Sequence, residues 1–214
     1  MDQRQLKSSE SIIKQTDGSF AVSAATPAGM VTSEQLIKIA ELVKQGKGIA
    51  KLTTAQSIMI FTSQDKVQSV KSSLAEVGLG LRPDGYTIRN IKACCGKLCK
   101  YTNQDTIKDA LALNQIFAGR ETPNKVKIAI SGCPKNCMEA LSNDIGFIGI
   151  PEGYQLYLGG RGGRRQVLGH LMREIKPEEM SSVIEGVIEK YMTAGKFRER
   201  ISHVIEKQGL EVFK

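Results

Sequence analysis

The feature that most constrains this chain is a set of five cysteines gathered in two short segments, Cys94 to Cys99 and Cys133 to Cys137. An odd number leaves at least one thiol outside any disulfide, and clustered cysteines in a reducing compartment are more often metal ligands or catalytic groups. Two loop-borne pairs that meet in space can hold an iron–sulfur cubane. The gaps after Cys95 and after Cys133 also suit structural zinc. Spacing alone therefore leaves iron–sulfur, zinc and unrelated thiols open.

The composition predicts a soluble, cytoplasmic protein. The 214 residues contain no apolar run near the ~18–20 residues of a membrane helix. The first 15 residues are polar and lack the apolar centre of a signal peptide. The net charge is +8, but the basic residues are spread along the chain and form no recognised nucleic-acid module. We therefore expect neither a nucleic-acid nor a membrane partner, and instead a basic pocket for a small anion or an anionic cofactor.

Hydrophobic periodicity predicts an α+β chain in two units, residues 1–85 and 86–214, with the turn signal Pro83-Asp84-Gly85 at the boundary. In the first unit we expect an open sheet with helices on one face, and Thr32 or Ser33 as a helix cap. Its expected strands are 19–25, 49–54 and 57–62, and its helices 32–45 and 63–77. The second unit is expected to contain strands at 125–130, 145–150 and 154–158, and helices at 103–117, 177–192 and 197–208.

The second cysteine segment closely resembles the cluster-binding signature of the sirohaem-dependent nitrite and sulfite reductases, in ISGCPKNC at 130–137 and DIG at 144–146. The first segment is similar to the family's first cysteine pair, in ACCGKLCK at 93–100. Further similarities are KVKI at 125–128, GYQLYLGG at 153–160 and LTTAQ at 52–56. The resemblance covers most of residues 20–210. It implies a ferredoxin-like half-domain at 1–85 followed by a sirohaem- and [4Fe–4S]-binding domain at 86–214.

The resemblance implies that Cys94, Cys99, Cys133 and Cys137 hold the [4Fe–4S] cluster, and that Cys137 is also the axial thiolate of the sirohaem iron. The first pair is shorter than is usual in the family, so Cys95 competes with Cys94 for the ligand position, and we favour Cys94. Two other departures are Ala55, where many members carry arginine, and a single copy of a fold that longer members contain twice.

Basic residues near these segments are expected to handle the anions. Two residues apart on a strand, Lys125 and Lys127 face the same side, and with Arg89 they match the family's substrate-binding residues. The alternative is a strand that turns its polar face to water. Sirohaem is rich in carboxylates, and five residues are expected to lie against it besides Cys137: Lys97, Lys100, Lys135, Gly160 and Arg161.

The resemblance implies an oxidoreductase that reduces sulfite to sulfide with six electrons, with nitrite as the alternative substrate. A non-catalytic iron–sulfur electron carrier and a zinc-stabilised binding module are the competing interpretations. Because no Gly-x-Gly-x-x-Gly fingerprint follows a strand, electrons are expected from a ferredoxin-like donor or a partner subunit. A symmetric homodimer is also expected, since it would supply the second copy of the fold.

Overall fold

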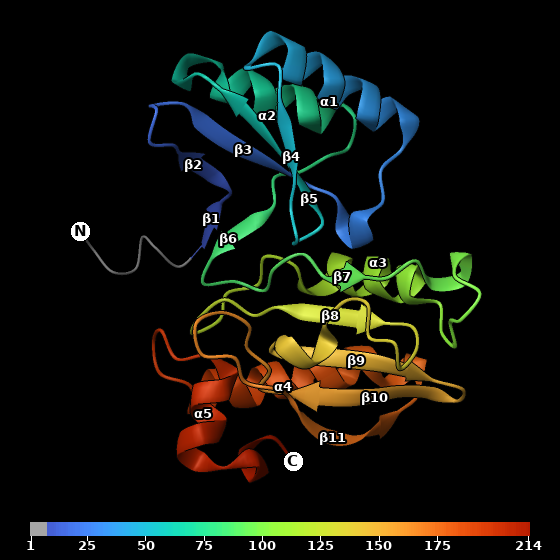
Figure 1. Ribbon diagram of the computed structural model, residues 1–214. Coiled ribbons are helices and arrows are strands. Elements are labelled where there is room, and N and C mark those ends of the chain that lie inside the picture. The colour runs from blue at the N-terminus through green and yellow to red at the C-terminus, as the bar shows by residue number, and fades with distance from the viewer. Residues whose placement is uncertain (1–7) are drawn as a thin grey trace.

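The computed structural model describes residues 8–214, which form two α+β units stacked on each other (Figure 1). The first unit contains a four-stranded antiparallel sheet in the order β2-β3-β5-β4, packed against two helices. Residues 8–10 and 83–85 form a separate two-stranded sheet beside it. The elements of this unit are β1 (Ser8–Glu10), β2 (Ile12–Lys14), β3 (Phe20–Ala25), α1 (Ser33–Gln45), β4 (Ala50–Leu52), β5 (Ser57–Thr62), α2 (Val67–Glu76) and β6 (Pro83–Gly85).

The first unit has its own hydrophobic core between sheet and helices. Val22 and Ile60 of the central strands meet Leu42 of α1 and Leu74 of α2, and each of them is almost completely buried. Helix α1 begins as expected, because the Thr32 hydroxyl accepts the Gln35 N–H while the Gln35 side chain accepts the Thr32 N–H. The predicted open sheet with helices on one face is confirmed.

The second unit contains a five-stranded mixed sheet in the order β11-β10-β9-β8-β7. Strand β8 runs parallel to β7 and β9, whereas β9, β10 and β11 are antiparallel. Three helices share one core with this sheet. The elements are β7 (Lys92–Ala93), α3 (Thr106–Phe117), β8 (Ile128–Ser131), β9 (Ile145–Ile150), β10 (Gly153–Leu158), β11 (His170–Ile175), α4 (Met180–Ala194) and α5 (Ile201–Gln208).

The alternation of side chains along β8 and β9 decides what covers each face of this sheet. Ile128, Ile130 and Phe147 belong to the core shared with the helices. Ala129 and Ile148 point to the opposite face, where they pack against Ala140 in the segment that follows the second cysteine pair. The segment that follows the second cysteine pair therefore lies over the face that the helices leave open.

The structure corrects three sequence-based expectations. Residues 83–85, predicted as a turn, form strand β6, an edge position where proline is tolerated because no ladder N–H is required. Strand β11 was not predicted, because residues 170–174 are mostly exposed on both faces and show no alternation. The last helix begins at Ile201 rather than near residue 197. None of the helices among residues 8–214 combines the length and the apolar character needed to cross a bilayer.

Candidate functional site

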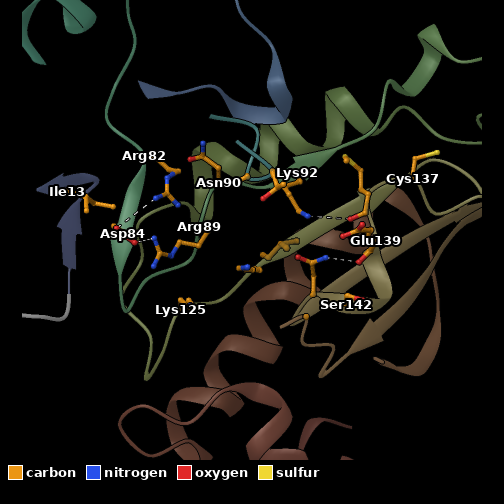
Figure 2. A pocket seen from close by; sticks show the side chains of 17 residues that line it. Ile13, Arg82, Asp84, Arg89, Asn90, Lys92, Lys125, Cys137, Glu139 and Ser142 are labelled. Atoms are coloured by element: carbon orange, nitrogen blue, oxygen red, sulfur yellow. Dashed lines mark hydrogen bonds and ion pairs between the residues drawn. The ribbon is translucent and has the colours of Figure 1, made fainter. Parts of the chain in front are cut away.

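A cavity of about 640 Å³ lies where the two units meet (Figure 2). Residues of the first unit, Thr54 and Ala55 among them, form part of its wall, and Cys137 of the second cysteine segment forms another part. Five cationic side chains line it against two carboxylates: Arg82, Arg89, Lys92, Lys125 and Lys127, with Asp84 and Glu139. The excess of positive charge makes the cavity suitable for an anion.

An extended backbone segment places Lys125 and Lys127 in the cavity. Val126 and Ile128 are fully buried in the core, so alternation turns the two lysines to the other side. Val126 continues the sheet beyond β8, because its N–H donates to the Thr87 carbonyl at 3.0 Å. The two lysines therefore face the same side, as their spacing predicted, and both line the cavity.

The three lysines of the cavity have pKa values below the ordinary value for lysine. Burial lowers the pKa of Lys125, and the nearby Arg200 and Arg89 lower it further. Burial also lowers the pKa of Lys127, followed by the charges of Lys125, Arg200 and Lys92. The pKa of Lys92 is lowered by burial, and Glu139 opposes the shift. These mutual effects show that the cations share one electrostatic environment that an anion would stabilise.

Arg89 is fixed by the chain segment around β6. Its Nη1 donates to the Pro83 carbonyl at 2.9 Å, its Nη2 donates to the Gly85 carbonyl at 2.9 Å, and Asp84 pairs with the guanidinium. The guanidinium is thus oriented before any ligand binds, at the end of the cavity opposite Cys137 (Figure 2).

A buried ion pair anchors the backbone of Lys127. Asp144, with no exposed surface, accepts the Lys127 N–H at 2.8 Å and the Arg200 Nε and Nη2 hydrogens at 2.8 and 2.5 Å. Arg200 lies 56 residues away at the start of α5 and was not singled out from the sequence. Asp144 belongs to the DIG motif at 144–146, so the sequence indicated one partner of this ion pair but not the other.

The two cysteine segments meet through Cys94. Its Sγ accepts the Gly132 N–H at 3.1 Å and lies 3.5 Å from the Thr106 hydroxyl, so it points at the second segment. Cys95 is exposed. A side chain on Gly132 would place its Cβ 2.2 Å from the Thr102 Oγ1, so only glycine permits this approach.

The second cysteine segment is held in an unusual backbone conformation. Asn136 and Glu139 have φ angles of 50° and 53°, the left-handed region that asparagine tolerates better than most residues. The Asn136 Oδ1 accepts the Ala140 N–H at 2.7 Å and the Ser131 hydroxyl at 3.1 Å. These bonds close the turn that carries Cys137 to the wall of the cavity.

Gln56 connects both cysteine segments to the first unit. Its amide donates to the Ala93 carbonyl at 2.7 Å and accepts the Ala93 N–H at 2.9 Å, in the manner of a neighbouring strand. The same Nε2 lies 3.5 Å from the Met138 sulfur. Gln56 therefore positions the residue before Cys94 and touches the residue after Cys137.

All five cysteines are free thiols. Across residues 8–214, no three His, Cys, Asp or Glu side chains converge as one metal ion would require. Four thiolates at about 2.3 Å would be needed to hold a single zinc. Two loops with four thiolates, one of them accepting a backbone N–H, suit the larger [4Fe–4S] cluster.

The other predicted cofactor-binding residues lie away from the cavity. Lys97 pairs with Asp105 at 3.3 Å. Lys100 and Lys135 both lie over the ring of Tyr101, at 4.9 and 4.4 Å from its centroid. All three lysines are exposed, and none of them lines the cavity.

Gly160 and Arg161 also lie outside the cavity lining. Gly160 is buried, and a Cβ there would lie 2.2 Å from the Leu141 carbonyl oxygen. Close packing against the neighbouring backbone therefore explains why this position is a glycine. Arg161 contacts His203 and lies 3.6 Å from Glu206 of α5. The structure therefore gathers Arg89, Lys125, Lys127 and Cys137, but not these two residues.

Each of the two units matches a known protein family. Residues 13–77 match the nitrite/sulfite reductase ferredoxin-like half domain, and residues 84–214 match the nitrite and sulphite reductase 4Fe-4S domain. An assimilatory-type sulfite reductase of Nitratidesulfovibrio vulgaris is 27% identical over 95% of this chain and 94% of its own length. The NAD(P)H nitrite reductase of Bacillus subtilis is 35% identical over 92% of this chain.

This chain spans 25% of the length of that Bacillus nitrite reductase, and 16% and 19% of those from Klebsiella oxytoca and Emericella nidulans. Among solved structures, dissimilatory sulfite reductase I is similar with a TM-score of 0.82 over 91% of this chain and 69% of its own, at 18% identity. The Mycobacterium tuberculosis NirA protein has a TM-score of 0.80 over the whole of this chain and 46% of its own, at 16% identity. At 18% and 16% identity, these two similarities show a shared fold only.

Proposed function

Because this chain belongs to the nitrite and sulfite reductase family, with its 4Fe-4S domain and ferredoxin-like half domain, we propose that it reduces sulfite to sulfide. The observation that carries the proposal is the cavity, which combines Cys137 with Arg89, Lys125 and Lys127. A thiolate and three cations at one cavity provide what an iron-bound oxyanion requires.

Four thiolates would hold the [4Fe–4S] cluster: Cys94, Cys99, Cys133 and Cys137. Cys94 is favoured over Cys95 because its sulfur faces the second segment and accepts the Gly132 N–H. Cys137 would also hold the iron of a sirohaem, because it is the cysteine that lines the cavity.

Sirohaem would supply a metal that binds the anion and passes on six electrons, chemistry that no side chain provides. The residues of this chain bind and protonate. Arg89, already oriented by β6, suits two-point binding of an oxyanion. Lys125 and Lys127 donate hydrogen bonds, and their lowered pKa values make their ammonium groups better proton donors to oxygens that leave as water.

We propose sulfite rather than nitrite as the substrate because this chain matches the sulfite reductase of N. vulgaris over nearly its full length. It matches the nitrite reductases over a quarter of their length or less. Nitrite reduction of the same type is the alternative. Steady-state rates with each anion and one artificial electron donor decide between them. A kcat/KM that is higher for nitrite would reverse the assignment.

Electrons would come from a ferredoxin-like donor or a partner subunit, since the chain has no dinucleotide-binding fingerprint. A cytoplasmic location and a symmetric homodimer stay predictions. Mixing an inactive Cys137→Ser chain with an inactive Lys127→Ala chain tests for a site shared between subunits, because only shared sites would regain activity in mixed dimers.

Metal analysis of anaerobically purified protein tests the proposal. We expect about four cluster irons, acid-labile sulfide and one sirohaem per chain, with a Soret band and a red band in the absorption spectrum. A broad brown shoulder without a Soret band would instead identify a non-catalytic iron–sulfur electron carrier. A colourless protein containing zinc would refute both interpretations.

A further inference from the structure

Two residues of the cavity that were not predicted from the sequence carry buried polar atoms without partners. Among residues 8–214, five buried side-chain nitrogen or oxygen atoms have no hydrogen-bond partner. Four of these atoms belong to residues that line the cavity: the Nε of Arg82, the Nε of Arg89, and both amide atoms of Asn90. Buried polar groups are normally satisfied, so this concentration indicates a missing ligand or water.

The fold explains why Arg82 faces the cavity. Leu81 packs against the core of the first unit, and alternation turns the next side chain to the opposite side. One nitrogen, Nη2, donates to the Ser11 hydroxyl at 2.9 Å, and Ser11 is in turn bonded to Ser23. Arg82 is therefore a held, largely buried cation; it lies beside Asp84 and Arg89 at the end of the cavity opposite Cys137 (Figure 2).

The kind of atom that lacks a partner indicates the missing ligand. Three of the four atoms are N–H donors, and only the Asn90 oxygen is an acceptor. One carboxylate, Asp84, lies between two guanidinium groups, close to Arg89 and 3.9 Å from Arg82, so this end keeps an excess positive charge. A surplus of donors with a surplus of positive charge selects an acceptor-rich anion over a neutral group.

We infer that Arg82 and Asn90 form a second anion-binding position in the cavity, next to Arg89, for an oxyanion group. The inference rests on the proposed function, which supplies two sources of that chemistry: a carboxylate of the tetrapyrrole and the oxyanion substrate. The donor atoms are covered in the ligand-free cavity, so the anion engages them after a rotation of the guanidinium and amide groups.

The test uses the holoprotein, with Arg82→Met and Asn90→Leu as variants and Arg120→Met as control. Arg120 pairs with Glu185 and does not line the cavity, so its loss removes a charge of the same kind elsewhere. Sirohaem per chain is measured by extraction, and sulfite binding by the change in the Soret band during titration with sodium sulfite. Circular dichroism establishes that each variant is folded.

If the position binds a cofactor carboxylate, the two variants lose sirohaem while keeping the cluster iron and labile sulfide. If it binds the substrate, sirohaem content is unchanged and the dissociation constant for sulfite rises about tenfold to a hundredfold, as for the loss of a hydrogen bond to a charged group. The control behaves as the wild type in either case.

Variants that hold wild-type sirohaem and bind sulfite within twofold of the wild type overturn the inference, and the orphaned atoms then bind only water. Should either variant fail to fold, Arg82→Gln and Asn90→Asp replace them. The glutamine removes the charge of Arg82 and an aspartate of the same shape as Asn90 repels the anion, so wild-type behaviour again overturns the inference. A wild type without sirohaem refutes the proposed function itself, an outcome distinct from a loaded protein whose variants are unchanged.

Discussion

The buried pair of Asp144 and Arg200 allows a quantitative test of how the cavity is supported. Asp144 is completely buried, and the Arg200 side chain is 10% exposed. Replacing Asp144 by asparagine leaves the guanidinium without a counter-charge, and replacing Arg200 by methionine leaves the carboxylate without one. Removing one partner of a buried pair costs about 3–5 kcal/mol.

At about 2–4 °C per kcal/mol for a chain of this size, each single variant should melt about 6–20 °C below the wild type. The double variant removes both charges and retains an amide oxygen for the Lys127 N–H, so it should lose only about 1–3 kcal/mol. It is therefore expected to melt at or above both single variants.

Thermal unfolding of anaerobically purified protein, followed by circular dichroism at one scan rate, measures the four melting temperatures. The Glu185→Gln variant is the control, because its partner Arg120 is more than a third exposed and exposed pairs contribute about 0–1 kcal/mol. A double variant whose loss equals the sum of the single losses would refute the reasoning, since the two side chains would then act independently.

Four further predictions concern the cysteine ligands, the turnover of the lysine variants, the titration of the lysines, and the close packing of the second cysteine segment. Cys94→Ser should abolish cluster iron and labile sulfide, whereas Cys95→Ser should retain both; the reverse result would shift the ligand assignment by one position. Lys125→Ala and Lys127→Ala should each lower kcat on the order of 100-fold with both cofactors bound; full activity would assign that lysine to the surface. The pKa values of both lysines are lowered from 10.5, so between the lowered values and pH 10.5 the folded protein binds fewer protons than the unfolded chain. The melting temperature of the apoprotein should therefore rise with pH in that range. A melting temperature that does not change with pH would contradict the lowered pKa values. In Gly149→Ala the added Cβ would lie 2.4 Å from a backbone oxygen of the second cysteine segment, so about 1–3 kcal/mol of stability should be lost together with cluster iron; a variant with wild-type melting temperature and iron content would show that the segment can shift.

Sequence patterns predicted the elements whose signal is local. Helix α1 begins at the residue that its capping pattern indicated, and strand β8 lies in the alternating run that carries Lys125 and Lys127 to one side. The cavity itself depends on contacts between the two units, which no local pattern encodes. Arg82 precedes β6 and Asn90 follows it, in the segment that joins the two units, and neither residue was predicted from the sequence.

Closeness to a cysteine in the sequence did not place Lys97, Lys100 or Lys135 in the cavity, and the cofactor role of these lysines stays a prediction. Lys100 follows Cys99 and Lys135 lies two residues from Cys137, yet both lysines lie over the ring of Tyr101. The partner of Asp144 could not be found either, because 56 residues separate it from Arg200. Long-range pairs of this kind require the tertiary structure.

The amide of Gln56 has a consequence for how this protein is made. During synthesis the residues of the first unit emerge before Ala93 and the cysteines, and domains generally begin to fold as they emerge. The side chain that pairs with both backbone groups of Ala93 has therefore emerged before the first thiol appears. A fragment beginning at residue 84 would contain every cysteine yet lack the amide against which the residue before Cys94 is aligned.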